Sequence, residues 1–398
     1  MEVGGEAGPT APRVVMLLLK FPPAFAGGGL QAATLMERLA RIGVPVTTLT
    51  CVPEEGPAPR VERAHGGVVR RFPMPVPRRF RTHLLGLRAF LWLWMNRDWD
   101  ILHIHSYSYF AVLPIWLARW RGRPVLIKTT VLSRDGAFAT EGNLIRRWML
   151  GAYRRADLLV ALSSALVDDL VERRRVPCRV LMVPNGVDTE IFRPATGEER
   201  RHARSQLSIP DDARVIVSCG EINARKNLIS VVRAMKRLGD RKVVLLAVGP
   251  MGEEQAYHEK LQQEVDRLPG GQEVRLLGSM SQREVASIVR ISDVFVLASR
   301  AEGLPNSLLE GLASGLPCVA TDIPGSADVL ADGGGRLVPL DDDARLAETF
   351  EDILDDPDCG ARLAREGLDL IEKRYTLDVI ARRYLDLYRE LMAERARG

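Results

Sequence analysis

A short polar segment that follows an apolar run carries the strongest chemical signal in this sequence. The run Val294–Ala298 is typical of a buried strand, and the segment Ser299–Ala313 behind it holds Glu302, Pro305 and Glu310. Because proline is tolerated in the first turn of a helix, we expect a helix to begin here, at the end of a strand. The free N–H groups and positive dipole end of such a helix form an anion site suited to phosphate.

Glu310 falls among apolar residues of this expected helix, between Leu309 and Leu312. A carboxylate in such a place is costly unless it meets hydroxyl groups or other donors. The hydroxyls of a ribose would meet that need. The alternative is an ordinary strand-to-helix turn with an exposed glutamate, and the spacing alone leaves both interpretations open.

The longer segment around both glutamates favours the ligand-binding interpretation. Residues 302–325, EGLPNSLLEGLASGLPCVATDIPG, resemble the donor-binding signature of the retaining family 4 glycosyltransferases, with seven residues between the glutamates. The segment Pro184–Pro194, PNGVDTEIFRP, resembles the interdomain segment of the same family. The resemblance covers nearly the whole chain and implies a hexosyltransferase-type glycosyltransferase with the GT-B fold.

Strands and helices are expected to alternate along the chain, which predicts α/β domains with parallel sheets wrapped by helices on both faces. The 398 residues are enough for two Rossmann-like domains that face each other across a cleft. We expect residues 1–188 to form the acceptor-side domain and 189–376 the nucleotide-sugar domain, and the resemblance implies that the helix 377–398 packs back on the first. The predicted strands are 14–19, 46–49, 68–72, 101–105, 125–130, 158–162, 180–183, 215–219, 243–248, 274–277, 294–298, 318–321 and 337–339.

The composition excludes several classes of protein. With 46% hydrophobic and 27% charged residues, the chain is expected to be a globular protein. No apolar run approaches a membrane span and the N-terminus lacks signal-peptide features, so a cytoplasmic location is expected. Five cysteines without paired spacing favour neither a disulfide nor a zinc framework, so no metal or cofactor is expected. The run Asp341–Asp343 precedes a helix and is expected to cap it.

The segment Ser218–Asn227 leaves a predicted strand and enters a helix. Gly220 lets the backbone approach a ligand closely, and Lys226 can reach a diphosphate as a point charge, the alternative being a solvated lysine at a helix start. In the resembling family, a Gly-Arg pair and a later lysine contact the phosphates. Lys226 matches that lysine, but Glu221 replaces the arginine, so Arg225 is the nearest candidate for the missing contact.

The resemblance assigns further roles on the donor side. Lys226 and Glu302 are expected to be catalytic, with Glu302 on the sugar, Glu310 on the ribose and the backbone of 278–281 on the base. A donor phosphate oxygen takes the acceptor's proton, so neither a protein nucleophile nor a metal is required. The expected donor-binding residues are Gly28, Gly29, Arg225, Lys226, Gly278, Met280, Glu302, Gly303, Leu304, Pro305, Asn306, Ser307 and Glu310.

The first half offers fewer signals. Gly27–Gly29 follows the first strand as either a flexible turn or, by the resemblance, a loop that reaches toward the diphosphate and the acceptor. His103 and His105 share a strand face, and without further zinc ligands they are expected to pack or hydrogen bond. The strand 125–130 ends where many relatives carry a histidine near the transferred sugar, and none is present here. The expected acceptor-side residues are His105, Lys128, Thr130 and Asp135.

Charge is distributed unevenly along the chain. Residues 70–155 hold sixteen lysines and arginines against four acidic residues, although the net charge of the whole chain is only +4. Within this basic region, residues 82–96 are apolar nearly all round if helical, which indicates either core packing or a membrane interface. We expect a glycan or lipid-linked acceptor and peripheral contact with an anionic membrane. No recognition motif supports nucleic acid as a partner.

Two other functions share some of these features. A non-catalytic nucleotide-sugar-binding protein of the same fold would explain Glu221 and the missing histidine. A nicotinamide oxidoreductase would share the alternation of strands and helices, but it should show a full G-x-G-x-x-G fingerprint and an acidic ribose partner, which this sequence lacks.

Overall fold

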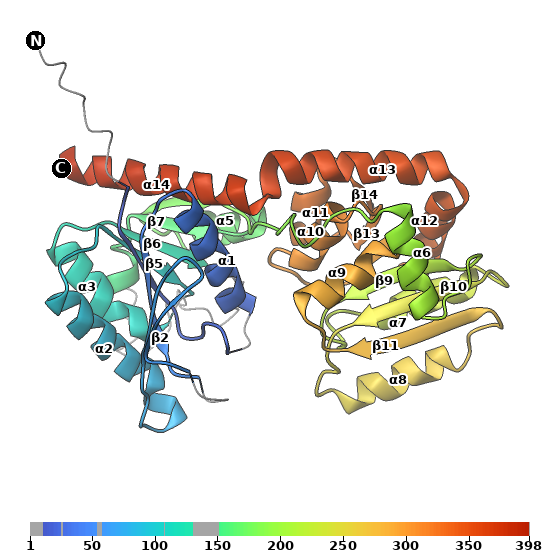
Figure 1. Cartoon of the computed structure of the whole chain (residues 1–398), viewed down its shortest axis with the longest axis horizontal. Helices are drawn as coiled ribbons and strands as arrows, with labels where there is room; N and C mark the ends of the chain where they lie inside the picture. The colour runs from blue at the N-terminus through green and yellow to red at the C-terminus, as the bar shows by residue number, and fades with distance from the viewer. Residues whose placement is uncertain (1–10, 25–26, 54–57, 107, 130–150, 398) are drawn as a thin grey trace, which may run out of the picture. The chain divides into compact units, whose positions relative to one another are not determined.

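In the computed structural model of the chain, residues 11–24, 27–53, 58–106, 108–129 and 151–397 are described (Figure 1). They belong to two compact units. The first comprises Met1–Pro184 and Leu377–Gly398, and the second Asn185–Thr376. The division between them falls inside the segment that the sequence marked as the interdomain crossing.

The first unit is built on an eight-stranded sheet with the order β3-β4-β2-β1-β5-β6-β7-β8. Every pair is parallel except β3 with β4, which is antiparallel. After β1 the chain adds β2 to β4 on one side of the sheet, and it then adds β5 to β8 on the other side. The strand order therefore reverses between β1 and β5. The strands are β1 Val14–Leu17, β2 Val46–Cys51, β3 Val61–Ala64, β4 Gly67–Phe72, β5 Ile101–His105, β6 Val125–Thr129, β7 Leu158–Ala161 and β8 Arg179–Met182.

Helices cover this sheet, and the last helix of the chain is one of them (Figure 1). Helix α14 packs against α1, and its Ile380, Tyr384, Leu387 and Leu391 share a buried core with the sheet. Their spacing places them on one helix face. The helices are α1 Gly27–Arg41, η1 Arg78–Phe80, α2 Arg81–Met95, η2 Tyr109–Ala111, α3 Val112–Trp120, α5 Ser164–Asp168, η3 Asp169–Arg173 and α14 Leu377–Arg397.

The second unit holds a six-stranded sheet with the order β11-β10-β9-β12-β13-β14, parallel throughout. Its central strands are apolar and buried on both faces, as expected for a parallel sheet wrapped by helices. The strand order reverses between β9 and β12. The strands are β9 Arg214–Cys219, β10 Val243–Val248, β11 Gln272–Gly278, β12 Val294–Leu297, β13 Cys318–Thr321 and β14 Gly335–Val338.

Several helices of the second unit begin with side-chain caps. Ser281 and Glu284 form a capping box, and Asp342 caps the helix that follows the aspartate run, as expected. The helices are α6 Gly197–Gln206, α7 Leu228–Arg237, α8 Gln255–Val265, α9 Gln282–Arg290, α10 Asn306–Ala313, α11 Pro324–Leu330, α12 Asp343–Asp355, α13 Pro357–Leu370 and η4 Ile371–Tyr375.

The predicted parallel α/β architecture and every predicted strand are confirmed, with shifts of one or two residues at some ends. The structure also contains one strand, β3, that the sequence did not predict. This edge strand is half-exposed and turns into β4 through His65 and Gly66, both with positive φ. In the described part of the chain, no helix is both long and apolar enough to span a bilayer.

Candidate active site

The loops that follow β9 and β12 meet at the point where the strand order of the second sheet reverses. The backbone N–H of Arg300 donates to the carbonyl oxygen of Arg225 at 2.8 Å, which joins the two loops. In open parallel sheets, ligands bind outside the carboxyl ends of the strands at such a reversal. The chain therefore places Lys226 and Glu302 at the position where a ligand is expected.

An acidic side chain and two basic ones converge there. Oε1 of Glu302 lies 2.9 Å from Nζ of Lys226 and 3.0 Å from Nη1 of Arg225. The side chains of Lys226 and Glu302 are only 16% and 11% exposed, whereas that of Arg225 is 47% exposed. One carboxylate thus holds two cations at the surface, and an anion that binds here can compete for both.

The loop after β9 is shaped by a close approach at Gly220. This residue has a φ of +144°, and a Cβ at its position would lie 2.7 Å from Cε of Lys226. The side chain of Asn223 accepts from the N–H of Lys226 at 3.0 Å, which positions the lysine just before α7. The carboxylate of Glu221 lies toward Gly252, in the loop that follows β10.

The ends of β10 and β11 complete this edge of the sheet. Gly249 has a φ of +146°, and a Cβ at its position would lie 2.0 Å from the carbonyl oxygen of Gly220. Its N–H donates to the carbonyl oxygen of Gly278 at 2.9 Å, and Gly278 leads to the half-buried Met280. Gly249 therefore connects the segment expected to hold the base with the loop that follows β9.

Helix α10 begins at Asn306 with Pro305 as its N-cap residue, so Pro305 precedes the first turn rather than lying in it as predicted. Oδ1 of Asn306 accepts from Nδ2 of Asn185 at 2.9 Å, and Leu304 is buried. The buried Oγ of Ser307 has no hydrogen-bond partner among the described residues. A ligand at the helix N-terminus would supply one.

The carbonyl oxygens of Glu302 and Gly303 lie against Gly325. A Cβ at Gly325 would come within 2.9 Å and 2.7 Å of these two atoms. The first turn of α11 therefore supports the loop that presents Glu302.

Glu310 lies in α10 close to Lys226, as its electrostatics show. Burial raises the pKa of Glu310 to about 7, and the charge of Lys226 opposes this rise. Burial also raises the pKa of Cys219, and the charge of Glu310 adds to the effect. A carboxyl group with a pKa of about 7 therefore lies beside the loop that follows β9.

The remaining predicted residues lie in the first unit. Gly28 and Gly29 belong to the first turn of α1, not to a free loop, which corrects the sequence-based prediction. A Cβ at Gly29 would lie 2.6 Å from the carbonyl oxygen of Lys20, so the close approach of the chain after β1 needs glycine there. Thr130 and Asp135 lie outside the described residues.

His105 and Lys128 are neighbours at the carboxyl ends of β5 and β6. Both are buried, and burial lowers the pKa of Lys128 to about 8. Burial, followed by the charge of Lys128, holds the pKa of His105 well below its usual value. His103 packs on His105 with ring centroids 4.2 Å apart and hydrogen bonds to Tyr388, which confirms the predicted packing role.

The family described as Glycosyl transferases group 1 matches residues 199–369, and Glycosyltransferase Family 4 matches residues 25–191. D-inositol 3-phosphate glycosyltransferase 1 of Catenulispora acidiphila is 31% identical over 367 residues, which are 85% of this chain and 86% of that protein. The chain belongs to glycosyltransferase family 4. It is a glycosyltransferase, as the resemblance implied.

Further likenesses agree with this assignment. D-inositol 3-phosphate glycosyltransferase of Saccharomonospora viridis is 30% identical, with 89% of this chain and 87% of that protein covered. Sucrose-phosphate synthase of Thermosynechococcus elongatus has a TM-score of 0.76 at 21% identity, covering 96% of this chain and 100% of its own. HepE of Anabaena in complex with UDP-glucose has a TM-score of 0.72 at 16% identity, covering 95% and 100%. These structures show that the glycosyltransferase has the GT-B fold.

Several residues that shape the site were missed in the sequence. Gly249 and Gly325 are needed for close backbone contacts, and Arg300 pairs with Asp341 at 2.6 Å to hold the loop after β12. Asn185 contacts the start of α10. The two glycines lie in a Gly-Pro and a Pro-Gly dipeptide that follow strands, and these dipeptides could have indicated them in the sequence. The ion pair between Arg300 and Asp341 has no such local signature.

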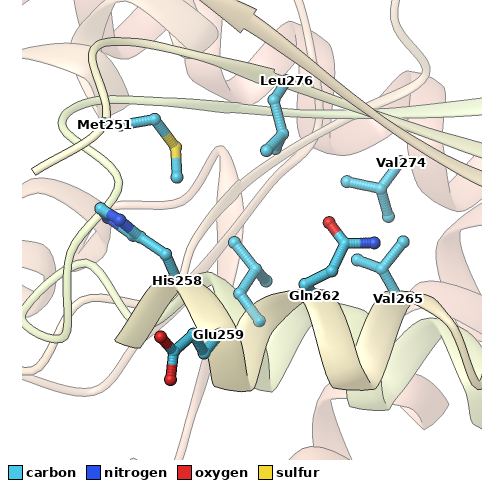
Figure 2. A pocket seen from close by; sticks show the side chains of 8 residues that line it. Met251, His258, Glu259, Gln262, Val265, Val274 and Leu276 are labelled. Carbon is cyan, nitrogen blue, oxygen red and sulfur yellow. The ribbon is translucent and has the colours of Figure 1, made fainter. Parts of the chain in front are cut away.

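A pocket of about 410 Å³ lies elsewhere in the second unit, between α8 and β11. In Figure 2, Gln262 and Val265 of α8 face Val274 and Leu276 across it. None of the predicted donor-binding residues lines this pocket. Among the described residues, no cluster of three or more histidine, cysteine, aspartate or glutamate side chains is placed to hold a metal ion.

Proposed function

We propose that this glycosyltransferase transfers a hexose from a nucleotide-diphosphate sugar to an acceptor hydroxyl, with retention of the anomeric configuration. The observation that carries the proposal is the convergence of Lys226 and Arg225 on Glu302, in front of the N-terminus of α10. Two cations and a helix N-terminus at one edge of a sheet suit a diphosphate. The complex of HepE with UDP-glucose supports a donor of this class.

The same contacts indicate which hydrogen bonds the bound donor replaces. The diphosphate oxygens take the hydrogen bonds that Lys226 and Arg225 now make with Glu302, which frees that carboxylate for the sugar hydroxyls. Glu310 accepts hydrogen bonds from the ribose hydroxyls. The backbone around Gly278 and the side chain of Met280 contact the base.

The chemistry follows from these positions. The bond between the anomeric carbon and the leaving phosphate oxygen breaks, positive charge grows on the sugar and negative charge on the diphosphate, and Lys226 and Arg225 stabilise the latter. The acceptor oxygen attacks from the face that the leaving group departs, and a donor phosphate oxygen takes its proton. This route needs neither a protein nucleophile nor a metal.

The acceptor is a glycan or a lipid-linked molecule in this proposal, with His105 and Lys128 on the acceptor side. We place the activity in the cytoplasm, in peripheral contact with an anionic membrane. The five cysteines have no paired spacing, and a reducing compartment suits such a set. D-inositol 3-phosphate, the acceptor named for the relatives above, is the first soluble compound to test.

A panel of nucleotide sugars tests the proposal. The purified protein is incubated with each donor, alone and with D-inositol 3-phosphate or a membrane extract, and mass spectrometry follows donor binding and nucleotide release. We expect release from one donor only when an acceptor is present. Proton NMR of the product then shows whether the anomeric configuration of the donor is kept.

Matched variants separate the site from the rest of the surface. Lys226→Ala and Glu310→Ala are expected to abolish release, whereas Lys242→Ala, which removes an exposed lysine paired with Asp212, and Glu348→Ala are expected to leave it unchanged. Selective donor binding without release under every condition would identify a non-catalytic sugar-nucleotide-binding protein. Inversion at the anomeric carbon would contradict the retaining mechanism.

A further inference from the structure

Helix α2 carries an apolar stripe that stays exposed in the described structure. Leu87, Leu91 and Trp94 follow one another at i, i+4 and i+7, so they share a helix face, and they are 45%, 46% and 47% exposed. Met95, beside them, is 72% exposed. The opposite face of the helix is buried through Leu85, Gly86, Ala89 and Leu93.

Trp120, the last residue of α3, extends this stripe. Its ring stacks on that of Trp94 with centroids 5.4 Å apart and 13° between the planes, yet it remains 72% exposed. Helices α2 and α3 pack side by side, so the two tryptophans form one surface (Figure 1). Tryptophan favours the boundary between lipid and water, where its apolar ring and its N–H group both find suitable surroundings.

The segments that carry this surface are strongly basic. Residues 78–97 and 109–123 contain eight arginines and neither aspartate nor glutamate. Some of these arginines form ion pairs with acidic residues elsewhere, as Arg119 does with Asp157 and Arg123 with Asp100. Arg79 and Arg97 are exposed at the two ends of α2. The surface therefore combines apolar side chains in the middle with positive charge at both ends.

Two contacts show how closely the arginines adjoin the aromatic rings. The guanidinium carbon of Arg79 lies 4.9 Å from the ring centroid of Phe80, which is itself 49% exposed. That of Arg121 lies 5.6 Å from the ring centroid of Trp94. Positive charge is crowded here, since the pKa of Arg121 is lowered first by desolvation and then by Arg97 and Arg123.

We propose that this face, made of Phe80, Leu87, Leu91, Trp94, Met95 and Trp120 with its flanking arginines, docks on an anionic lipid bilayer. The apolar side chains enter the upper acyl region and the arginines contact lipid phosphates. Charge argues against a second copy of the chain as the occupant, because a symmetric dimer would bring the exposed Arg79 and Arg97 of one copy to the same face as those of the other. This inference adds a docking surface to the proposed function. It rests on that function in one respect only, which is that the acceptor lies at a membrane.

Vesicle flotation without any nucleotide sugar tests the surface. We expect the protein to float with vesicles of phosphatidylcholine and phosphatidylglycerol but not with phosphatidylcholine alone, and binding to weaken as salt rises. Arg79→Glu with Arg97→Glu is expected to lower the apparent affinity at least ~10-fold by reversing two charges. Met95→Ser with Trp120→Ser is expected to lower it by a similar factor, since both side chains are mostly exposed and their loss leaves the fold intact.

Matched pairs of substitutions elsewhere in the first unit serve as controls. Arg382→Glu with Arg383→Glu makes the same change in net charge on the exposed face of α14. Val171→Ser with Met182→Ser removes apolar side chains that are 48% and 41% exposed, on η3 and β8. Both control pairs are expected to float like the unchanged protein, and circular dichroism checks that every variant is folded.

Three results would overturn the inference. The first is equal flotation with neutral and anionic vesicles, and the second is an equal loss of flotation in face and control variants. The third is a dimer in analytical ultracentrifugation that Met95→Ser with Trp120→Ser dissociates, because the face would then bind a second copy. Nucleotide release is measured in parallel with D-inositol 3-phosphate and with a membrane extract: its absence with both, together with normal flotation, would remove the proposed function and leave the membrane surface standing.

Discussion

Nδ1 of His103 and the hydroxyl oxygen of Tyr388, 285 residues apart in the chain, lie 2.7 Å from each other in the interior of the first unit. Both side chains are fully buried. His103 belongs to the central strand β5 and Tyr388 to the last helix, so this hydrogen bond ties the end of the chain to the middle of the first sheet. The first unit therefore needs α14 to complete its core.

Tyr388→Phe is expected to destabilise the first unit without emptying the core. Losing the hydroxyl leaves Nδ1 of His103 buried without a partner, which costs about 1–3 kcal/mol. Urea unfolding followed by circular dichroism measures this. Tyr109→Phe, at a tyrosine that is 36% exposed, is the control and is expected to change the free energy of unfolding by less than ~0.5 kcal/mol. Equal effects of the two substitutions would contradict the role of the hydrogen bond.

The same histidine predicts how stability depends on pH. Burial, then the charges of His105 and Lys128, hold the pKa of His103 well below its usual value. Below the ordinary value of 6.5, the unfolded chain therefore binds a proton that the folded chain does not, so stability falls as pH decreases from about 6.5. His103→Leu should flatten this fall by up to ~1.4 kcal/mol per pH unit. Parallel curves for the two proteins would show that His103 does not contribute.

Arg225 is expected to perform the task of the arginine that Glu221 replaces. Its guanidinium lies 3.0 Å from Glu302, whereas the carboxylate of Glu221 lies toward Gly252. Arg225→Ala should lower kcat/KM for the donor ~10–100-fold, as expected for the loss of a charged hydrogen bond, and Arg225→Lys should recover only part of it. Glu221→Gln should change kcat/KM less than ~3-fold. Steady-state kinetics with the donor that the protein uses measure these values. A larger loss of kcat/KM in Glu221→Gln than in Arg225→Ala would refute this role of Arg225.

The sequence predicts those parts of the site that depend on local pattern. The strand, turn and helix around Glu302 and Glu310 were visible because apolar runs, proline and carboxylates lie within one short segment. The convergence of Arg225 and Glu302 was not, because these residues are 77 positions apart and only the sheet topology brings their loops together. Spacing alone cannot report such a contact.

The errors have physical causes as well. Gly27–Gly29 was interpreted as a loop because glycine disfavours helices, yet packing of α1 on the sheet overrides that preference, with Ala32 and Ala33 fully buried. Strand β3 was missed because an edge strand with a half-exposed, polar sequence lacks the apolar signal of the central strands. In both cases tertiary contacts decided the outcome.

Gly325 is predicted to be essential for the position of Glu302. Because a Cβ there would come within 2.9 Å of the carbonyl oxygens of Glu302 and Gly303, Gly325→Ala must push their loop outward. A shift of about 1 Å at a group that positions substrate is expected to lower kcat ~100-fold. The control is Gly270→Ala, where nothing lies within 4 Å of the added carbon. Unchanged kcat in Gly325→Ala, with an unchanged fold, would show that Glu302 tolerates the displacement.

Glu310 is predicted to make donor affinity depend on pH near neutrality. Burial raises its pKa to about 7 in the free protein, and the ionised carboxylate is the form that accepts hydrogen bonds from two ribose hydroxyls. Affinity should therefore rise ~10-fold between pH 6 and pH 8 and level off above, because the ionised fraction grows in that proportion. Isothermal titration calorimetry with the intact nucleotide sugar measures this, since its doubly esterified diphosphate does not titrate in the same range. Glu310→Gln should bind more weakly at pH 8 and lose the dependence; a dependence that survives the substitution would mean that another group titrates.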